Sequence, residues 1–97
     1  MKEGFVYILS NKTDGVLYVG VTSDIKRRLY EHRNHLIKGF TDKYNVTKVL
    51  YVDFTERIFD AILREKQIKH WNRKKKMDLI KEFNPGLKDL YDEIMNS

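Results

Sequence analysis

The stretch that most constrains the fold covers residues 17–32, which read as an apolar strand, a glycine and then a capped helix. The apolar residues before position 22 are typical of a strand. Thr22, Ser23 and Asp24 all favour a helix N-cap, so we expect a helix to begin directly after them. A strand therefore passes into a helix within a few residues.

The polar residues of this stretch fall where a fold alone would rarely place them. Tyr18 lies in the strand, while Arg28 and His32 are one helical turn apart and share a helix face. The helix is predicted to run to about residue 37, with a buried stripe of Ile25, Leu29 and Leu36. A lone histidine on such a stripe is more often a hydrogen-bonded core residue than a catalyst. Arg28, however, is angled towards the sheet, so we interpret the stretch as a site for a phosphodiester.

Two strands precede this helix. Residues 4–10 form a continuous β-prone run that reads as a strand covered on both faces, and residues 16–21 form a second strand. Turn residues ending in Asp-Gly separate them and predict a hairpin. We expect a register in which Tyr7 lies opposite Tyr18, so that both hydroxyls project to one side of the sheet.

Gly20 interrupts the second strand, and two explanations are open. In the structural explanation it marks a bulge or a close approach of another backbone. In the functional explanation it leaves room for a substrate phosphate near Tyr18. Further along, residues 38–45 lack periodicity and read as a loop, before a third strand over residues 46–54. Phe40 and Tyr44 in that loop either dock on the core, which we favour, or stack on a nucleobase.

Glu65 is the most unusual residue of the next helix, which begins at residues 55–56. It falls in the middle of the apolar face that Ile58, Ala61, Ile62 and Ile68 define. A carboxylate at an apolar position is costly unless it is paired or bound to a cation. Two interpretations remain open: a buried ion pair with Arg28 or Arg64, or a ligand for Mg²⁺ or Mn²⁺.

The positive charge of the chain is concentrated in one segment. The net charge is +5 and the pI about 9.4, and residues 64–81 hold eight Lys or Arg against two acids. A basic face of this kind is a usual footprint of nucleic-acid binding, although it can also be a solvated helix face. The candidate nucleic-acid-binding residues are Arg27, Lys69, Arg73, Lys74, Lys75 and Lys76.

Length and composition bound the remaining possibilities. Ninety-seven residues make a single domain, with a core over about residues 3–80 and a C-terminal helical extension over about 84–96 that packs on it. The chain has no cysteine and no apolar run near the roughly 18–20 residues of a membrane span. We therefore expect a cytoplasmic protein without membrane contact.

These residues together resemble the GIY-YIG nuclease superfamily, with the nearest match among its small stand-alone bacterial members. Phe5-Val6-Tyr7 stands at the first motif and Tyr18-Val19-Gly20 at the second. Arg28, His32 and Glu65 match the family's helix and acidic positions. The first motif begins here with Phe5 instead of glycine, but it keeps its tyrosine, Tyr7. The family often has an asparagine near the end of the domain, and Asn72 and Asn84 are the two candidates for it in this chain.

The resemblance implies an α+β domain in which a small three-stranded antiparallel sheet is flanked by helices. It also implies a phosphodiesterase site with one metal ion, Mg²⁺ or Mn²⁺, held by Glu65. Tyr7 would act at the attacking water as base or orienter, with Tyr18 assisting. Arg28 would stabilise charge on the phosphate, and His32 would orient its neighbours or relay a proton.

The leading hypothesis is therefore a metal-dependent DNA endonuclease, and the resemblance suggests a role in repair or recombination. Members of the family usually take sequence specificity from appended domains, so we expect recognition of DNA shape or a partner protein here. The alternative is a catalytically weak or inactive nucleic-acid-binding module of the same fold. A third possibility is an adaptor that docks through Leu87, Leu90, Tyr91 and Ile94, which requires that stripe to be exposed.

Overall fold

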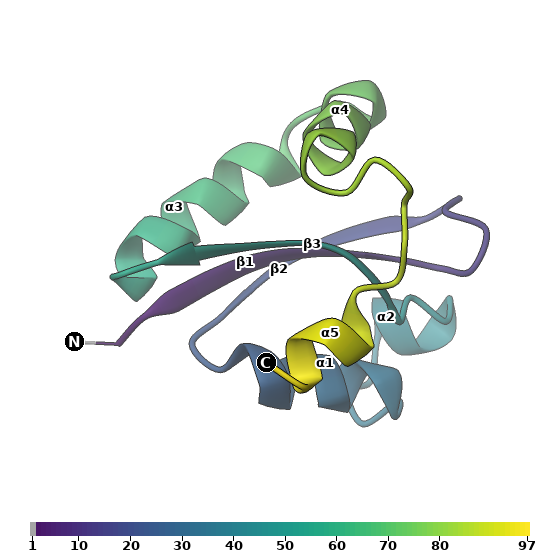
Figure 1. The fold of residues 1–97 in the computed structure, drawn as a ribbon, viewed down its shortest axis with the longest axis horizontal. Helices are drawn as coiled ribbons and strands as arrows, with labels where there is room; N and C mark the ends of the chain where they lie inside the picture. Colours follow the sequence, from purple (N-terminus) through teal and green to yellow (C-terminus); the bar gives the residue numbers. More distant parts are fainter. Residues whose placement is uncertain (1) are drawn as a thin grey trace.

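The computed structural model describes residues 2–97 and has three layers, with helices on both faces of one antiparallel sheet (Figure 1). The strand order is β2-β1-β3, so β1 is central. The elements in chain order are β1 (Gly4–Ser10), β2 (Leu17–Thr22), α1 (Ile25–Arg33), α2 (Phe40–Lys43), β3 (Lys48–Thr55), α3 (Ile58–Lys69), α4 (Arg73–Phe83) and α5 (Tyr91–Met95). Helices α3 and α4 lie above the sheet in Figure 1, and α1, α2 and α5 lie below it. The α+β fold expected from the resemblance is confirmed.

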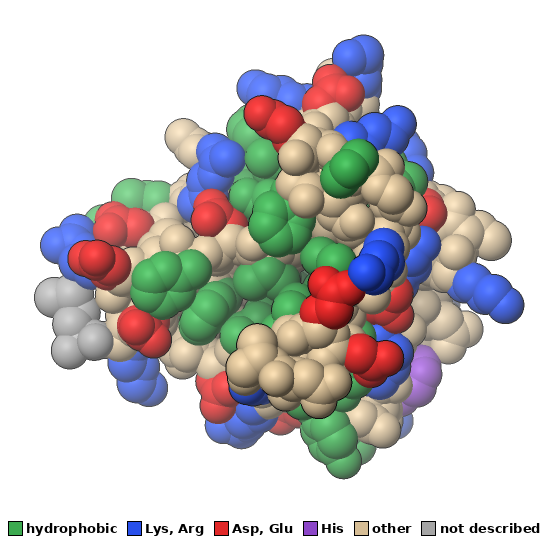
Figure 2. All heavy atoms as spheres, in the orientation of Figure 1, with side chains coloured by type: hydrophobic (Ala, Val, Ile, Leu, Met, Phe, Trp, Pro, Cys, Tyr) green, Lys and Arg blue, Asp and Glu red, His purple; other side chains and the backbone are tan. Residues whose placement is uncertain are grey.

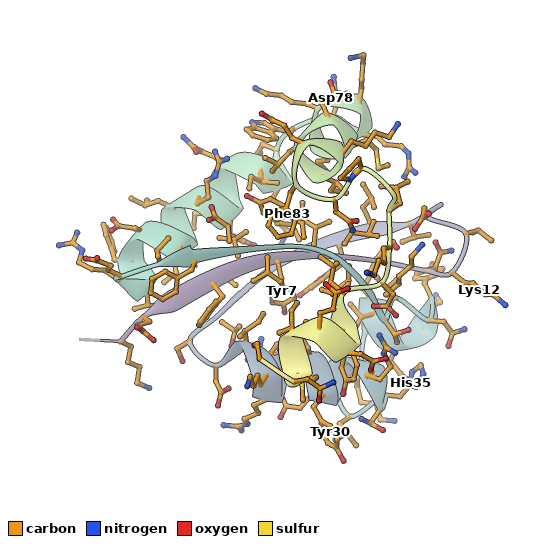
Figure 3. The ribbon with its side chains drawn as sticks, in the orientation of Figure 1. Tyr7, Lys12, Tyr30, His35, Asp78 and Phe83 are labelled. Carbon is orange, nitrogen blue, oxygen red and sulfur yellow. The ribbon has the colours of Figure 1, made fainter. Side chains whose placement is uncertain are left out.

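The sheet divides the core into two clusters because successive side chains of a strand point to opposite faces. On β1, Val6 and Ile8 face α3 and α4 and pack with buried residues that include Ala61. Tyr7 and Leu9 face the other way and pack with residues that include Ile25, Leu29, Val46 and Val49. β1 is buried on both faces because it is the central strand. The side chain of Tyr7 points to the face of the sheet that α1 covers (Figure 3).

The register of the hairpin differs from the one expected from the sequence. Tyr7 pairs with Gly20, and Tyr18 pairs with Leu9, so the predicted Tyr7–Tyr18 pairing is wrong by two residues. Because the shift is an even number of residues, both tyrosines still lie on the same face of the sheet. Their ring centroids are 6.3 Å apart.

Helix α1 ends at Arg33, four residues before the predicted end. His35 adopts a left-handed conformation with φ 56°, and Leu36 N–H donates to the carbonyl of Glu31 at 2.9 Å. His35 N–H donates to the carbonyl of His32 at 3.2 Å, which completes a Schellman motif. Leu36 consequently lies outside the helix and is 61% exposed, so its predicted place in the buried stripe is wrong.

The segment after α4 crosses from one face of the sheet to the other (Figure 1). Leu87 packs on the α3 side, whereas Leu90, Tyr91 and Ile94 pack on the α1 side. Only residues 91–95 of the predicted helical extension are helical. The preceding segment turns at Pro85-Gly86 and then has Leu87 in a left-handed conformation, with φ 50°. The apolar stripe is packed on the core as expected, which removes the main support for an adaptor role.

The surface around β3 is apolar on the face shown in Figure 2, where hydrophobic side chains gather between the helices above and below. The exposed large hydrophobic residues of β3, α3 and α4 are Phe54, Phe59, Leu63 and Phe83. None of the helices within residues 2–97 combines the length and the hydrophobicity of a membrane-spanning helix.

Candidate active site

A buried hydrogen-bonded chain joins three elements of the α1 layer. The hydroxyl oxygen of Tyr7, on β1, lies 3.0 Å from Nε2 of His32, on α1. The other ring nitrogen of His32, Nδ1, lies 3.0 Å from the hydroxyl oxygen of Thr41, on α2. All three side chains are buried. His32 therefore lies on the core-facing stripe of α1, as predicted, and both of its ring nitrogens have a partner.

Thr41 is a site residue that the sequence interpretation missed. It falls within residues 38–45, which were predicted as a loop, but residues 40–43 form the short helix α2. Four residues are too few to show a helical period, so the sequence carried no signal for it. The helix turns Thr41 inwards to His32, where it is 5% exposed.

Electrostatics keep this chain of hydrogen bonds neutral. Burial, together with the nearby charge of Arg28, lowers the pKa of His32 to about 4. Burial raises the pKa of Tyr7 to about 12, although the interaction with Arg28 opposes the rise. Both groups are uncharged at pH 7. A proton does not pass from Tyr7 to His32 in the free protein, because the pKa of the donor is far above that of the acceptor.

Arg28 supplies the positive charge beside this chain. Burial lowers its pKa, but the interactions with Tyr7 and Glu31 outweigh burial and raise the pKa overall. Its Nε lies 3.4 Å from Glu31 Oε1, and its side chain is 39% exposed. Arg28 can therefore meet a ligand from solvent while it lies near enough to Tyr7 for each group to shift the pKa of the other.

Position 20 requires a residue without a side chain because the ring of Tyr7 lies against it. A Cβ atom at Gly20 would be 2.3 Å from Cζ of Tyr7, far inside van der Waals contact. The β1–β2 ladder runs without a register shift, so the bulge interpretation is wrong. The ring of Tyr7 also fills the space that was considered for a phosphate. The approach is that of a side chain, not of another backbone.

Glu65 projects from α3 and has only one ion partner among the described residues. Lys69 Nζ lies 3.5 Å from Glu65 Oε2, and the Glu65 side chain is 12% exposed. The ion pairs considered with Arg28 and Arg64 do not form, since Arg28 pairs with Glu31 and Arg64 lies over a tryptophan ring. The charge of Glu65 makes a minor contribution to the raised pKa of Tyr7, after burial and the charges of Tyr18 and Arg28.

The donor set around Glu65 fits a hard divalent cation held by a single carboxylate. No group of three or more His, Asp or Glu side chains that could hold a metal occurs within residues 2–97. Mg²⁺ is commonly bound in proteins by one or two carboxylates, with waters and substrate phosphates completing its shell. Glu65 can play that part without further protein ligands.

The two candidate asparagines both have structural partners. Asn72 is the N-cap of α4, and its side chain accepts from the backbone N–H of Lys75 at 2.8 Å. Asn84 is buried, and its side-chain amide donates to the carbonyls of Leu50 and Lys88 at 3.2 and 2.8 Å. These bonds tie the crossing segment to β3, and no hydrogen bond links either asparagine to Tyr7 or His32.

The predicted basic face is divided into separate groups. Lys74 pairs with Asp78 at 3.0 Å, and Lys75 lies over the ring of Trp71, 4.3 Å from its centroid. Arg73 donates to the carbonyls of Asp14 and Gly15 and so holds the hairpin turn. The basic residues of α4 thus have different neighbours, because successive residues of a helix point in different directions. Their part in nucleic-acid binding stays a prediction.

Three of the predicted basic residues lie near the tyrosine site. Lys69 and Lys76 line a hollow of about 270 Å³ together with Tyr18 and Phe40. Arg27 pairs with Glu31 at 3.4 Å and is 75% exposed, beside Arg28. The structure thus brings part of the predicted nucleic-acid-binding set to the site.

The expected docking of Phe40 and Tyr44 on the core is wrong. Phe40 is 47% exposed and Tyr44 44% exposed. The ring of Phe40 stacks on Tyr18 at 6.2 Å with an interplanar angle of 24°, and Tyr18 in turn meets His32 edge-on at 5.7 Å. The aromatic cluster therefore extends from the buried site to the surface.

The fold and the tyrosine site define a small α+β domain of the nuclease type. Residues 3–78 match the GIY-YIG catalytic domain, and the chain belongs to this family. The relation predicted from Tyr7, Tyr18 and Gly20 is confirmed.

Relatives of similar size support this assignment. A UPF0213 protein of Staphylococcus saprophyticus is 33% identical over 82 residues, which cover 84% of this chain and 99% of the relative. A UPF0213 protein of Staphylococcus aureus is 34% identical over the same length and coverage. The solution structure of the UPF0213 protein from Bacillus halodurans matches with a TM-score of 0.58 and 26% identity, over 90% of this chain and 92% of that one.

Proposed function

We propose that this protein is a divalent-metal-dependent endonuclease that hydrolyses phosphodiester bonds in DNA. The observation that carries the proposal is the convergence of Tyr7, Tyr18, Arg28 and His32 on one side of the sheet. These residues come from β1, β2 and α1, and a GIY-YIG catalytic domain supports this chemistry.

Arg28 is the group that meets the scissile phosphate. Its planar guanidinium can donate to two phosphate oxygens at once, and it stabilises the charge that develops on them in the transition state. Tyr18, which is half-buried beside it, supplies a hydroxyl at the mouth of the site. Both side chains are within reach of solvent, unlike Tyr7.

Tyr7 acts in its neutral form. A phenol with a pKa of about 12 holds a negligible fraction of phenolate at pH 7, so it is a poor base in the free protein. Its hydroxyl instead donates to Nε2 of His32, whose Nδ1–H donates to Thr41 in the corresponding tautomer. Arg28 lies near enough for its charge to affect the pKa of Tyr7. Tyr7 and His32 thus orient Arg28 for the phosphate, and a base role would require bound cations to lower the pKa of Tyr7.

Glu65 would hold the Mg²⁺ or Mn²⁺ ion. Such an ion, when bound, supplies Lewis-acid stabilisation of phosphate oxygens. Lys69, 3.5 Å from the carboxylate, keeps the charge of Glu65 partly balanced in the free protein. DNA shape or a partner protein supplies specificity, as for an enzyme of repair or recombination, since phosphate contacts carry no sequence information.

A cleavage assay tests this proposal. Purified protein is incubated with labelled single-stranded, duplex, nicked, flap and branched DNA in Mg²⁺, Mn²⁺ or EDTA. We expect metal-dependent cutting by the wild type and none by Glu65→Ala, with the DNA affinity of the variant retained. Glu56→Ala is the matched control, because Glu56 is an exposed glutamate in the turn before α3 and should cut normally.

Binding without cutting on any substrate would contradict the endonuclease proposal and favour the inactive binding module. Direct Mn²⁺ binding, measured by calorimetry on wild type and Glu65→Ala, provides a readout that does not depend on turnover. Equal Mn²⁺ affinity in both proteins would remove Glu65 as the ligand.

A further inference from the structure

A groove along the outer edge of β2 adjoins the proposed active site. It has a volume of about 270 Å³ and is lined by Leu17, Tyr18, Val19, Phe40, Lys69 and Lys76. Its walls are mainly aliphatic and aromatic, with two ammonium groups among them. β2 is an edge strand, so no other strand covers this side of it.

The aromatic side of the groove offers a ring face to a ligand. Phe40 is 47% exposed although it stacks on Tyr18 at 6.2 Å and contacts Tyr44 at 5.0 Å. Aromatic side chains displayed in this way are platforms on which unpaired bases stack, because every base has a π face. A paired base inside a duplex has both of its faces covered by its neighbours.

The basic residues of the groove come from two helices and connect it to the site. Lys69 ends α3 and also contacts Glu65, whereas Lys76 lies at the end of the first turn of α4. Both ammonium groups can bind phosphates of a DNA strand that has one of its bases stacked on Phe40. Tyr18 belongs both to the groove and to the proposed active site, so a DNA strand bound in the groove leads to that site at Tyr18.

We infer that this groove binds an unpaired nucleotide, with its base on Phe40 and its phosphates at Lys69 and Lys76. The inference rests on the proposed function and names its substrate class: DNA with a single-stranded segment next to the scissile bond. The volume supports one nucleotide, since it is just below the roughly 300 Å³ at which pockets for drug-sized ligands begin.

Binding measurements in EDTA test the groove without cleavage. The probes are a fluorescently labelled single strand of about 12 nucleotides and a blunt duplex of the same length, read by anisotropy. Phe40→Ala should raise the Kd for the single strand about tenfold and change the duplex Kd less than about twofold. Phe40→Trp, which keeps a ring face, should retain single-strand binding.

Phe59→Ala is the matched control, because Phe59 is a phenylalanine of similar exposure (58%) at the opposite end of α3 from Lys69. It should bind both probes like the wild type. Single-strand affinity that is unchanged in Phe40→Ala, or lost equally for both probes, would overturn the groove assignment.

The two proposals fail separately. Glu65-dependent cutting together with Phe40-independent binding would overturn the groove alone. Phe40-dependent binding of the single strand without any cutting would leave the groove standing and overturn the endonuclease proposal alone.

Discussion

The ring of Tyr7 occupies the space that a side chain at Gly20 would need. The two residues pair across the β1–β2 ladder, and the missing side chain at Gly20 lets the tyrosine lie flat across the neighbouring strand. That position brings the Tyr7 hydroxyl within 3.0 Å of His32. The glycine of the second motif therefore sets the position of the tyrosine of the first.

Gly20→Ala should destabilise the protein by about 1–3 kcal/mol, because the methyl group forces the Tyr7 ring to move. Urea denaturation measures this cost. In a Tyr7→Leu background the same substitution should cost much less, and equal costs in both backgrounds would contradict the contact. Gly15→Ala is the control: its Cβ would have its nearest neighbour at 3.5 Å, so a change within about 0.5 kcal/mol is expected.

The stability of the protein should fall as the pH drops from 7 to 5. The pKa of His32 is about 4 in the folded state and about 6.5 in the unfolded state, so the unfolded state binds more protons over this range. The contribution of His32 is then fully present above pH 6.5, and about 2 kcal/mol is lost by pH 5. Urea denaturation at several pH values checks it. His32→Gln should lose this slope, whereas His70→Gln, at an exposed position, should keep it.

Arg28→Lys should lower kcat about a hundredfold with little change in KM, because a point charge cannot reproduce two parallel hydrogen bonds to a phosphate. Steady-state kinetics on the best substrate of the cleavage assay measures the effect. Arg27→Lys provides the neighbouring comparison: Arg27 is 75% exposed and pairs with Glu31, so its replacement should act weakly and mainly on KM. A larger loss of kcat in Arg27→Lys would reverse the assignment.

Lys75 and Lys76 are adjacent in sequence but should differ in their effect on DNA binding. Lys76 lines the β2-edge groove, whereas Lys75 lies over Trp71. Lys76→Gln should reduce the slope of log K against log salt by about 0.7–0.9, as expected for the loss of one phosphate contact. Lys75→Gln should leave the slope unchanged. Equal slopes for the two variants would show that binding follows total charge and not the groove.

Much of the site could be predicted from the sequence because it depends on local pattern. The strand over residues 4–10, the N-cap before α1 and the place of His32 on the buried stripe all follow from periodicity and capping chemistry. The spacing of Tyr18, Arg28 and His32 is fixed by strand and helix geometry, so these residues had to share one region.

The errors have a different origin: some depend on contacts between distant segments, and others on short local turns that no periodic pattern predicts. The end of α1 is set by the Schellman motif at His35, and the hairpin register by the fit of Tyr7 over Gly20. Thr41 reached the site through a helix too short to have a period. Lys75 and Lys76 separated because α4 packs in one orientation against the sheet, which no local pattern specifies.

The sequence by itself determined which elements form and which chemical groups they carry, because propensity, capping and periodicity act within a few residues of the chain. Only the tertiary structure decided that His32 is neutral and that the rings of Tyr18 and Phe40 stack at the surface. The first depends on burial, which lowers the pKa of an imidazole only when other elements exclude water from it. The second depends on how α2 meets β2, and it turned an expected core residue into the proposed contact for an unpaired base.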